Sequence, residues 1–380
     1  MLDKKSDNII IGAGISGLAC AKQLDKYHKD FILISKDIGG RILKSKDGST
    51  NYGAFFVCTD YKNILPYVSI KKRIRLRDFC FHDANKIYSL YEPKLIPYIP
   101  QFIKIERHLL RFKKHLHKLR RTSQLISQKK AIEKDPYLHE LYMKNAYDFV
   151  LQQNLIEGTK RYLSKALYST TFSTINEMNA FSFLQFLLPL ITPIYTFNFE
   201  KDKMIKPFQE KIILDTVKHI SYKNNRYIVK TQKHSYQSKH IVLATEINWS
   251  CKYANISNYN KPVITNMVHI KASPKKQIDT KLYHLFSPPN NTQAIANLDD
   301  GTYLYYYKNE PPDFQRWFTK IEIVHQKQWN PAGTINGHVL IESKRGNNMY
   351  IIGDYNIAGL EESYITGIFS ANDIIKNCRL

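Results

Sequence analysis

Three glycines near the start of the chain have the spacing of a phosphate-binding loop. They are Gly12, Gly14 and Gly17, and Ile15 and Ser16 lie between the last two. The first glycine would allow a tight turn, the second would let a pyrophosphate approach the backbone, and the third would let a helix pack closely on a sheet. A helix that starts here also offers free N–H groups and a partial positive charge. The spacing therefore predicts a site for a dinucleotide.

The elements around this loop are the ones that such a site needs. Residues 7–11 are apolar and predict a buried strand, residues 18–24 predict a helix, and residues 31–34 predict a second strand. Strand, glycine loop, helix and strand form half of a doubly wound nucleotide-binding unit.

The second strand lacks the acidic residue that usually holds a ribose, about 20 residues after the loop. Ser35 occupies that place and Lys36 follows it. A serine can bond a ribose, but without the strength of a charged acceptor. The lysine suggests an alternative, a ribose with a 2′-phosphate as in NADP. Asp37 could also reach back from the next loop as a substitute acid.

Two further segments complete a recognisable pattern. Gly39-Gly40-Arg41 follows the second strand, and Gly53-Ala54-Phe55 follows a polar turn. With the first loop, they resemble the FAD-binding half of the flavin-containing amine oxidase, protoporphyrinogen oxidase and phytoene desaturase superfamily. The resemblance implies FAD as the cofactor, with Gly40 and Arg41 beside the pyrophosphate and flavin. It implies that Arg41 contacts an anion, the alternative being a solvated surface arginine. It also implies that the backbone of residues 53–55 lines the flavin ring.

The end of the chain carries a second motif of the same superfamily. Residues 348–352 predict a strand that ends at Gly353 and Asp354, and a helix is expected from Ser363 to Lys376. The resemblance implies that Asp354 meets the ribityl or pyrophosphate part of FAD. It also implies that the helix N-terminus, at Ser363, Tyr364 and Ile365, points at flavin N1 and O2. A helix N-terminus would stabilise the negative charge of reduced flavin there.

Single residues in the motifs and in the middle of the chain extend the resemblance. Val217 matches a strand residue whose backbone meets the adenine, and Ala244 with Thr245 matches the end of a later strand. Tyr364 aligns with one wall of the aromatic cage of monoamine oxidases, and Gly367 would allow close approach to the cofactor. Trp329 is expected to line the active site, with core packing as the alternative.

One residue of the amine oxidases is missing. A lysine that holds a water against flavin N5 is expected near Asn266 and Met267, and Lys271 comes too late. This absence puts amine oxidase chemistry of that kind in doubt.

Charge and periodicity suggest a partner. The 380 residues carry a formal net charge of +23, which favours contact with an anion, a membrane surface, RNA or an acidic substrate. Residues 102–121 predict an amphipathic helix. Its apolar face holds Phe102, Ile105, Leu109, Phe112, Leu116 and Leu119, and its basic face holds Arg107, Arg111, Lys114, Lys118 and Arg121. The basic face is either solvated or docks on an anionic membrane; no specific nucleic acid is predicted.

Cysteine usage and hydropathy bound the remaining possibilities. Five cysteines are scattered singly, so a disulfide framework and structural zinc are not expected, and no metal is predicted. The apolar stretch 181–197 is broken by two prolines and is too short to span a bilayer; it predicts a helix that borders the substrate cavity or belongs to the core. The first strand leaves no room for a signal peptide, which indicates a cytoplasmic protein.

The sequence thus predicts an α/β protein of two interleaved domains. A Rossmann-like FAD-binding domain is expected from residues 1–60, 200–260 and 340–380. A discontinuous α+β substrate-binding domain with a helical insertion is expected from residues 61–199 and 261–339. The predicted function is an FAD-dependent oxidoreductase that takes a hydride from a C–H bond of a small amine or an unsaturated, hydrophobic compound. The alternatives are a non-redox flavoprotein of the mutase or isomerase type and an inactive FAD-binding protein.

Overall fold

The glycine loop belongs to a six-stranded sheet. The computed structural model describes residues 4–83, 86–276, 278, 282–288 and 290–377; Cys378 lies outside them. The strand order is β19-β20-β13-β2-β3-β9, and all neighbours except β19 and β20 are parallel. The strands are β2 (Asn8–Ala13), β3 (Ile32–Ile38), β9 (Ile212–Leu214), β13 (His240–Leu243), β19 (Lys344–Arg345) and β20 (Met349–Ile351).

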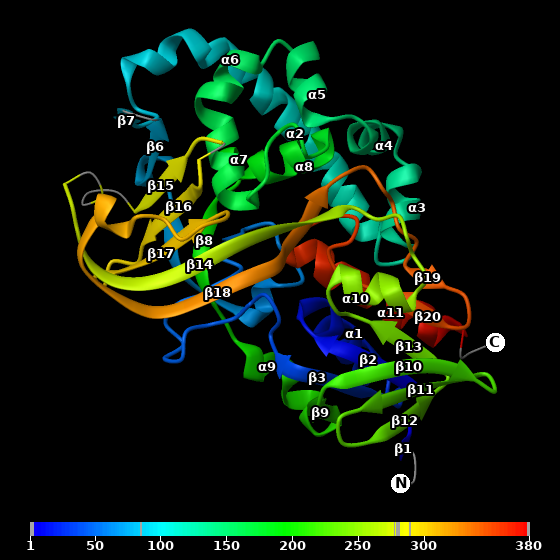
Figure 1. The fold of residues 1–380 in the computed structure, drawn as a ribbon. Coiled ribbons are helices and arrows are strands. Elements are labelled where there is room, and N and C mark those ends of the chain that lie inside the picture. The colour runs from blue at the N-terminus through cyan, green and yellow to red at the C-terminus, as the bar shows by residue number, and fades with distance from the viewer. Residues whose placement is uncertain (1–3, 84–85, 277, 279–281, 289, 378–380) are drawn as a thin grey trace.

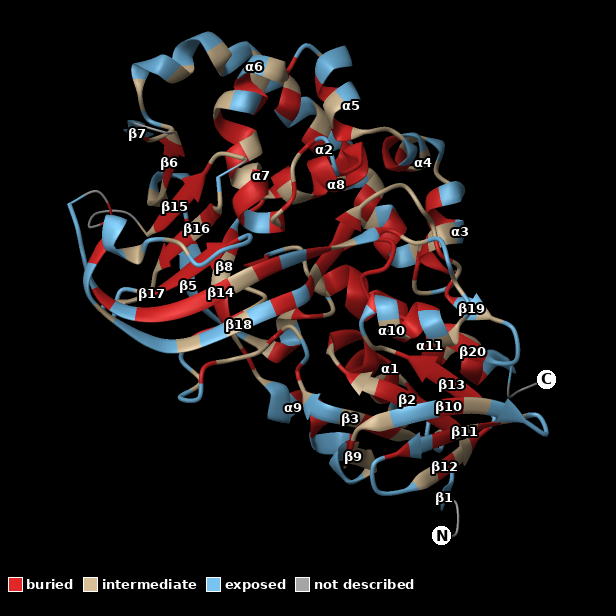
Figure 2. Ribbon diagram, viewed as in Figure 1, coloured by how far each residue is buried: buried red, intermediate tan, exposed pale blue. Residues whose placement is uncertain are grey.

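Two helices cover one face of this sheet and a smaller sheet lies on the other (Figure 1). The helices are α1 (Ile15–Lys26) and α11 (Leu360–Asn377), and they bury their apolar residues against the sheet. The smaller sheet has the order β1-β12-β11-β10 and packs with α10 (Ile247–Tyr253). Its strands are β1 (Lys4–Lys5), β10 (Val217–Lys223), β11 (Arg226–Thr231) and β12 (Ser235–Ser238). Figure 2 shows that the central strands are buried, as expected for a parallel sheet covered on both faces.

The second large sheet has seven strands, most of them antiparallel, in the order β18-β14-β17-β16-β15-β6-β7. Only β6 and β15 pair in parallel. Its strands are β6 (Phe79–Asp83), β7 (Lys86–Tyr88), β14 (Lys261–Pro274), β15 (Tyr283–Phe286), β16 (Thr292–Asn297), β17 (Thr302–Tyr307) and β18 (Phe318–Asn336). A small sheet of order β4-β8-β5 adjoins it, with β4 (Val57–Cys58), β5 (Val68–Ile74) and β8 (Ile194–Phe199).

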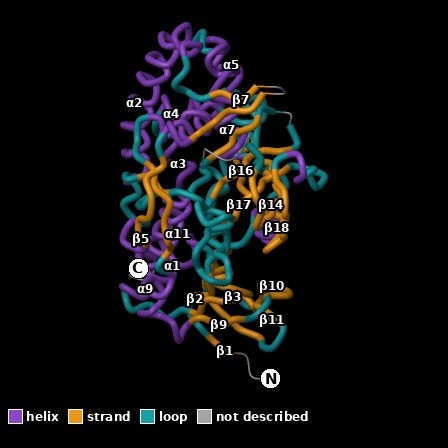
Figure 3. Tube along the Cα trace, turned by 90° about the vertical axis from the view of Figure 1, so that its left-hand side faces the viewer, coloured by secondary structure: helices purple, strands orange, loops and turns teal. Residues whose placement is uncertain are grey.

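Helices gather at the end of the molecule opposite the six-stranded sheet (Figure 3). They are α2 (Ile99–Thr122), α3 (Gln128–Glu133), α4 (Pro136–Met143), α5 (Ala146–Gln152), α6 (Ile156–Gly158), a π-helical turn (Thr159–Leu163), α7 (Ser164–Thr171) and α8 (Ala180–Leu187). Helix α9 (Lys201–Ile205) lies apart, near β9. Short 3₁₀ turns span Leu65–Tyr67, Leu76–Asp78, Pro93–Tyr98, Leu188–Leu190, Lys206–Lys211 and Phe314–Arg316. No helix in the described ranges is long and apolar enough to cross a membrane.

Helix α2 has the two faces that the periodicity predicts. Five of its predicted apolar positions are buried in one core cluster and Phe102 packs against that cluster, while all five predicted basic residues are exposed. Exposed apolar residues, Ile99, Ile103 and Leu110, lie among the basic ones. An anionic membrane surface as its partner stays a prediction.

Three boundaries differ from the sequence-based expectation. The apolar stretch 181–197 is not one helix, because α8 ends at Leu187, before Pro189, and the chain is extended from Ile194. Residues 238–245 are not one strand, because the chain passes from one sheet to another at Lys239. Helix α11 begins at Leu360, which places two glutamates in its first turn.

Gly367 provides a test of the packing between α1 and α11. A Cβ added there would lie 2.2 Å from the carbonyl oxygen of Ser16 and 2.8 Å from the amide nitrogen of Cys20. Both are backbone atoms and cannot move aside, so we expect Gly367→Ala to lower the free energy of unfolding by about 1–3 kcal/mol. Urea unfolding measures this change. Gly346→Ala is the control, because Gly346 is exposed with no atom within 4 Å of its Cβ position; equal stability of the two variants would contradict the prediction.

Candidate active site

The glycine loop is shaped by contacts that exclude side chains at two of its three glycines. Gly12 has φ +105°, and a Cβ there would lie 2.4 Å from the carbonyl oxygen of Ala244. A Cβ on Gly17 would lie 1.9 Å from the carbonyl oxygen of Gly12. These contacts hold the start of α1 against the ends of β2 and β13, as the spacing predicts.

Gly14 differs, because no protein atom lies within 4 Å of the place of its Cβ. It is the N-cap of α1, without a side-chain capping bond. The space in front of it is therefore open to a ligand, beside the N-terminus of α1 and next to Ile15 and Ser16. Gly40 closes one side of the loop, because its Cβ would lie 3.1 Å from Gly14 Cα.

The residues predicted near a ribose lie at the end of β3. The Ala13 N–H donates to Ser35 Oγ over 3.1 Å, so this hydroxyl ties β3 to the glycine loop. Lys36 and Asp37 follow on the same strand and are exposed. The ribose-binding roles of all three stay predictions. A cleft of about 660 Å³ opens next to them, lined by residues 38–39, 42–44 and 199–203.

Arg41 and Asp354, 313 residues apart in sequence, form a bidentate ion pair. The Nη1 and Nη2 atoms of Arg41 each lie 2.6 Å from one Asp354 carboxylate oxygen, and Nη1 also donates to Ala332 O. The Thr334 N–H donates to the same carboxylate. The aspartate side chain is 7% exposed and that of the arginine 37%, so the arginine is the more accessible member of the pair.

Burial and pairing act in opposite directions on the pKa of each member. Burial alone would raise the pKa of Asp354, but the Arg41 guanidinium and its hydrogen bonds hold that pKa below its usual value. Burial would lower the pKa of Arg41, and the Asp354 carboxylate raises it instead. The pair is therefore ionised, and it joins the two motifs that the sequence places in one site.

Gly53 links this pair to an aromatic wall. A Cβ on Gly53 would lie 2.2 Å from Arg41 O and 3.2 Å from the Trp329 ring, and Ala54 N–H donates to Arg41 O. Trp329 is buried in a cluster with Tyr52, Met267, Leu304 and Tyr306, against which Phe55 packs. Its indole Nε1 has no hydrogen-bond partner among the described residues.

Sequence reasoning missed a lysine in this wall. Lys327 lies two residues before Trp329 on β18, and its Nζ is 4.7 Å from the centre of the Trp329 ring. The sheet register places Lys327 directly beside Met267 of β14, near which the resemblance leads us to expect a lysine. The cation therefore reaches the same area from the neighbouring strand. Because the register between β14 and β18 shifts at several positions, the sequence alone does not show that these two residues are neighbours.

Tyr364 is not part of the wall that contains Trp329. It is 4% exposed and lies in the cluster between α1, α11 and the six-stranded sheet, with its ring stacked on Tyr67 at 6.5 Å. Gly367 likewise faces α1, which corrects the expectation that it faces the cofactor. The predicted catalytic role of Tyr364 has no support from this position.

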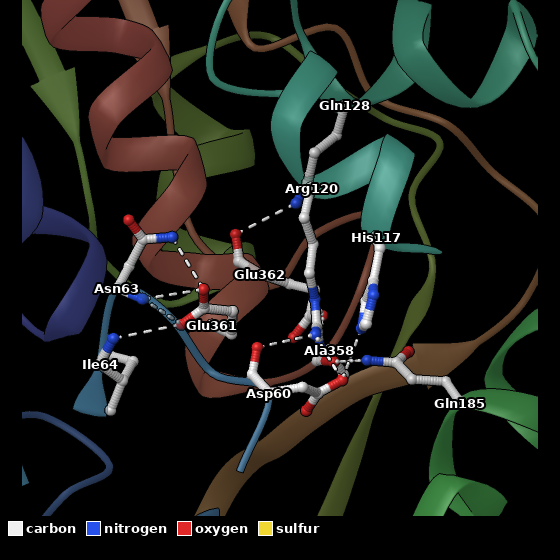
Figure 4. Close-up of polar contacts among 10 residues, drawn as sticks. All are labelled: Asp60, Asn63, Ile64, His117, Arg120, Gln128, Gln185, Ala358, Glu361 and Glu362. Carbon is white, nitrogen blue, oxygen red and sulfur yellow. Dashed lines mark hydrogen bonds and ion pairs between the residues drawn. The ribbon is translucent and has the colours of Figure 1, made fainter. Parts of the chain in front are cut away.

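The first turn of α11 is held by buried carboxylates (Figure 4). Glu361 accepts hydrogen bonds from the backbone N–H groups of Asn63 and Ile64 and from the Asn63 side chain. Burial raises the pKa of Glu361 to about 7, and the neighbouring Glu362 adds to that rise. Glu362 accepts from Arg120 over 2.9 Å, and Arg120 also binds Asp60. This turn thus docks α11 on α2 and on residues 60–64.

The remaining predicted residues lie in several different elements, and their roles stay predictions. Val217 begins β10 in the four-stranded sheet, away from Trp329. Gly353 lies two residues after the end of β20, and its N–H donates to Thr366 Oγ1. Ser363 and Ile365 are buried within α11.

A dinucleotide fits this arrangement. The open space at Gly14 and the start of α1 suit a pyrophosphate, and the uncharged Ser35 departs from the expected pattern. The unpartnered Nε1 of Trp329 suits a polar ligand atom beyond the ion pair.

Comparisons with known proteins agree with this architecture. Residues 10–69 match the family model of an NAD(P)-binding Rossmann-like domain. No curated protein sequence matches the chain. Three solved structures with the same fold cover 99% of it. Putrescine oxidase bound to putrescine has a TM-score of 0.68, 12% identity and 100% of its own chain covered. Cyclohexylamine oxidase from Brevibacterium oxydans IH-35A has a TM-score of 0.65 and 14% identity, and 100% of its own chain is covered. A CLA-producing fatty acid isomerase from P. acnes has a TM-score of 0.71 and 15% identity, and 99% of its own chain is covered.

These matches confirm the fold prediction. The chain has a Rossmann-like unit within a mixed α/β fold, and it shares this fold with putrescine oxidase and cyclohexylamine oxidase.

The ion pair yields a pH-dependent prediction. We expect Asp354→Asn to lower the free energy of unfolding at pH 7 by about 1–3 kcal/mol, because it leaves a partly buried guanidinium unpaired. The folded-state pKa of Asp354 is depressed, so the pair stabilises the protein above the unfolded pKa, and this stabilisation is lost as the pH falls through the folded pKa. The difference between wild type and variant should therefore shrink below about pH 4.

Denaturant unfolding between pH 7 and pH 3 measures this difference. Asp299→Asn is the control, because Asp299 forms an exposed ion pair with Lys72, 52% accessible on both sides, and should change stability little. A difference that stays constant down to pH 3 would contradict the assignment.

Proposed function

We propose that the protein is an FAD-dependent oxidoreductase of the amine oxidase type. In this proposal, residues 1–60, 200–260 and 340–380 hold FAD, and residues 61–199 and 261–339 hold the substrate. The observation that carries the proposal is the meeting of Arg41 and Asp354, from opposite ends of the chain, beside the open space at Gly14. A simple NADP dehydrogenase would account for the loop and for Lys36, but not for this pairing.

The residues around the space have separable tasks. The start of α1 would bind the pyrophosphate, and the Arg41–Asp354 ion pair would hold the two motifs together around it. Bound FAD would supply the redox chemistry, accepting a hydride from a substrate C–H bond before reoxidation by O₂ or another acceptor. Trp329, Tyr52 and Tyr306 offer an apolar, aromatic wall that suits an amine or an unsaturated, hydrophobic substrate.

Lys327 adds a cation to this wall. It would disfavour a protonated amine next to Trp329 and favour the neutral amine, which is the form that can lose a hydride. The position of Lys327, paired with Met267 from the adjacent strand, supports this role for it.

A non-redox flavoprotein is the second candidate. The fatty acid isomerase shares the fold over the whole chain, and the apolar wall would also accept an unsaturated chain. The two functions separate in one experiment. Flavin absorption that is bleached anaerobically by an amine supports the oxidoreductase, whereas double-bond migration without net oxidation supports the isomerase. A protein that retains no flavin after reconstitution with FAD would overturn both.

A substitution at Gly14 tests whether the glycine loop binds the cofactor. We expect Gly14→Asp to place a carboxylate in the open space and repel the pyrophosphate, lowering FAD affinity at least about tenfold, or about 1.4 kcal/mol. The ratio of flavin to protein absorption after reconstitution measures this effect. Gly346→Asp, at an exposed glycine far from the loop in sequence, is the control. A Gly14→Asp protein fully loaded with flavin would refute the placement.

A substitution of Lys327 tests whether the aromatic wall around Trp329 belongs to the active site. We expect Lys327→Met to lower kcat roughly tenfold or more while FAD content stays unchanged, because a single charge next to the reacting atoms is lost. Steady-state kinetics over a range of pH measure the change and reveal a shifted pH profile. Lys271→Met removes an exposed lysine of the adjacent strand and should leave kcat intact. Equal turnover of the Lys327 variant and wild type would remove this residue from the site.

A further inference from the structure

Three side chains with metal-binding atoms converge in the seven-stranded sheet, away from the site described above. Cys80 Sγ lies 2.9 Å from His284 Nδ1 and 3.4 Å from His82 Nε2, and the two imidazole nitrogens lie 2.9 Å apart. All three residues are buried, with exposures of 4%, 3% and 1% for Cys80, His82 and His284. No fourth histidine, cysteine or carboxylate joins them among the residues that the structure describes.

The sheet itself fixes this arrangement. Cys80 and His82 are alternate residues of β6 and so face the same side, and His284 is the direct register partner of Cys80 on β15. The residues between them, Phe81 and Leu285, face the opposite side and belong to the cluster of Trp329. The three ligands therefore lie on the sheet face turned away from the aromatic wall.

Aromatic rings enclose the cluster on that face. The His82 ring stacks on Phe286 at 4.4 Å and meets the edge of Trp317 at 5.3 Å. Both rings belong to a separate apolar cluster that packs on the outer side of the sheet. Such an enclosed shell fixes the orientation of the ligand side chains and limits access from solvent.

Hydrogen bonding alone does not explain the convergence. A ring nitrogen directs its proton or its lone pair along one line in the ring plane, so it serves one hydrogen-bond partner well. Here His284 Nδ1 is 2.9 Å from two partners at once, and all three ligand atoms surround a common point. A cation at that point would satisfy all of them together.

The ligand types select the ion. A thiolate with two imidazoles favours Zn²⁺ or Cu⁺ and disfavours Mg²⁺ and Ca²⁺, which prefer oxygen. Three protein ligands on two adjacent strands leave a further position for a water molecule or another ligand. Binding would displace the thiol proton of Cys80.

We propose that Cys80, His82 and His284 bind one Zn²⁺ or Cu⁺ ion that clamps β6 to β15. In the described sheet, β6 and β7 join the other five strands through β15 alone. These two strands precede the helical region in the chain and the other five follow it, so the ion would lock the junction between the two parts of the substrate-binding sheet. Cysteine spacing hid this site, because its ligands come from segments about 200 residues apart.

Metal analysis of the full-length protein tests the proposal. Protein expressed in medium supplemented with zinc and copper, then passed through gel filtration with a weak chelator, should carry about one equivalent of zinc or copper by mass spectrometry. Cys80→Ser and His284→Asn should carry less than about a tenth of that amount. Cys251→Ser, a buried cysteine outside the cluster, should match wild type. Wild type without either metal, or Cys80→Ser with as much metal as wild type, would overturn the proposal.

A second measurement does not depend on the variants folding. Removal of the ion from wild type with a strong chelator should lower Tm by several degrees, and stoichiometric Zn²⁺ should restore it, because an ion that binds only the folded state stabilises that state. Substitution with Co²⁺ should produce a thiolate-to-metal absorption band in wild type and in Cys251→Ser. An unchanged Tm and the absence of this band in wild type would each contradict a Cys80 ligand.

Discussion

The close approach of the two ends of the chain is the constraint on which the rest of the structure depends. Helices α1 and α11 touch through backbone at Gly367, the glycine loop touches Ala244, just after β13, through backbone at Gly12, and Gly17 packs α1 on the carbonyl of Gly12. These contacts leave no room for side chains, so they set the distance between the first loop and the last strand. Only at that distance can the short guanidinium–carboxylate bonds between Arg41 and Asp354 form.

The electrostatics of this meeting point follow from its burial. An enclosed aspartate is costly unless it is paired, and the arginine on the opposite motif supplies the partner. The pairing keeps both groups ionised, because the carboxylate offsets the cost of burying the arginine and the guanidinium offsets that of the aspartate. Gly53 lies between the backbone carbonyl of Arg41 and the ring of Trp329. It therefore connects the residue that forms the ion pair to the wall of Trp329, Tyr52 and Tyr306.

Much of the fold could be predicted because the decisive residues act locally. The glycines of the first loop stand where a Cβ would collide or where a ligand needs space, and these needs follow from the strand-loop-helix pattern alone. The faces of α2 follow from its period, and the later strands follow from their apolar runs. The resemblance added the association of the two outer motifs, which no local pattern contains.

The rest depends on pairings that local patterns do not encode. Lys327 reaches Met267 only through a strand pair whose register shifts several times, and each shift changes which residues are neighbours. Arg120 looks like one more member of a basic helix, yet it is buried against Asp60 and Glu362 because α2 docks on α11 at that point. The resemblance places Tyr364 in the site, and the structure packs it in the core beside Tyr67, so its role in the site stays a prediction.

The interleaving of the strands has a consequence for biosynthesis. Asn8 pairs with His240, and the sheet that contains them is completed only by Met349–Ile351. At about 5–20 residues per second, a ribosome needs roughly 20–70 s to deliver that last strand after the first has emerged. Strand β2 can pair early with β3 and pack against α1, but its other edge has no partner until β13 is made, and the face that α11 covers stays exposed until the end of synthesis. The nascent chain therefore presents an unpaired apolar edge that a chaperone would have to shield.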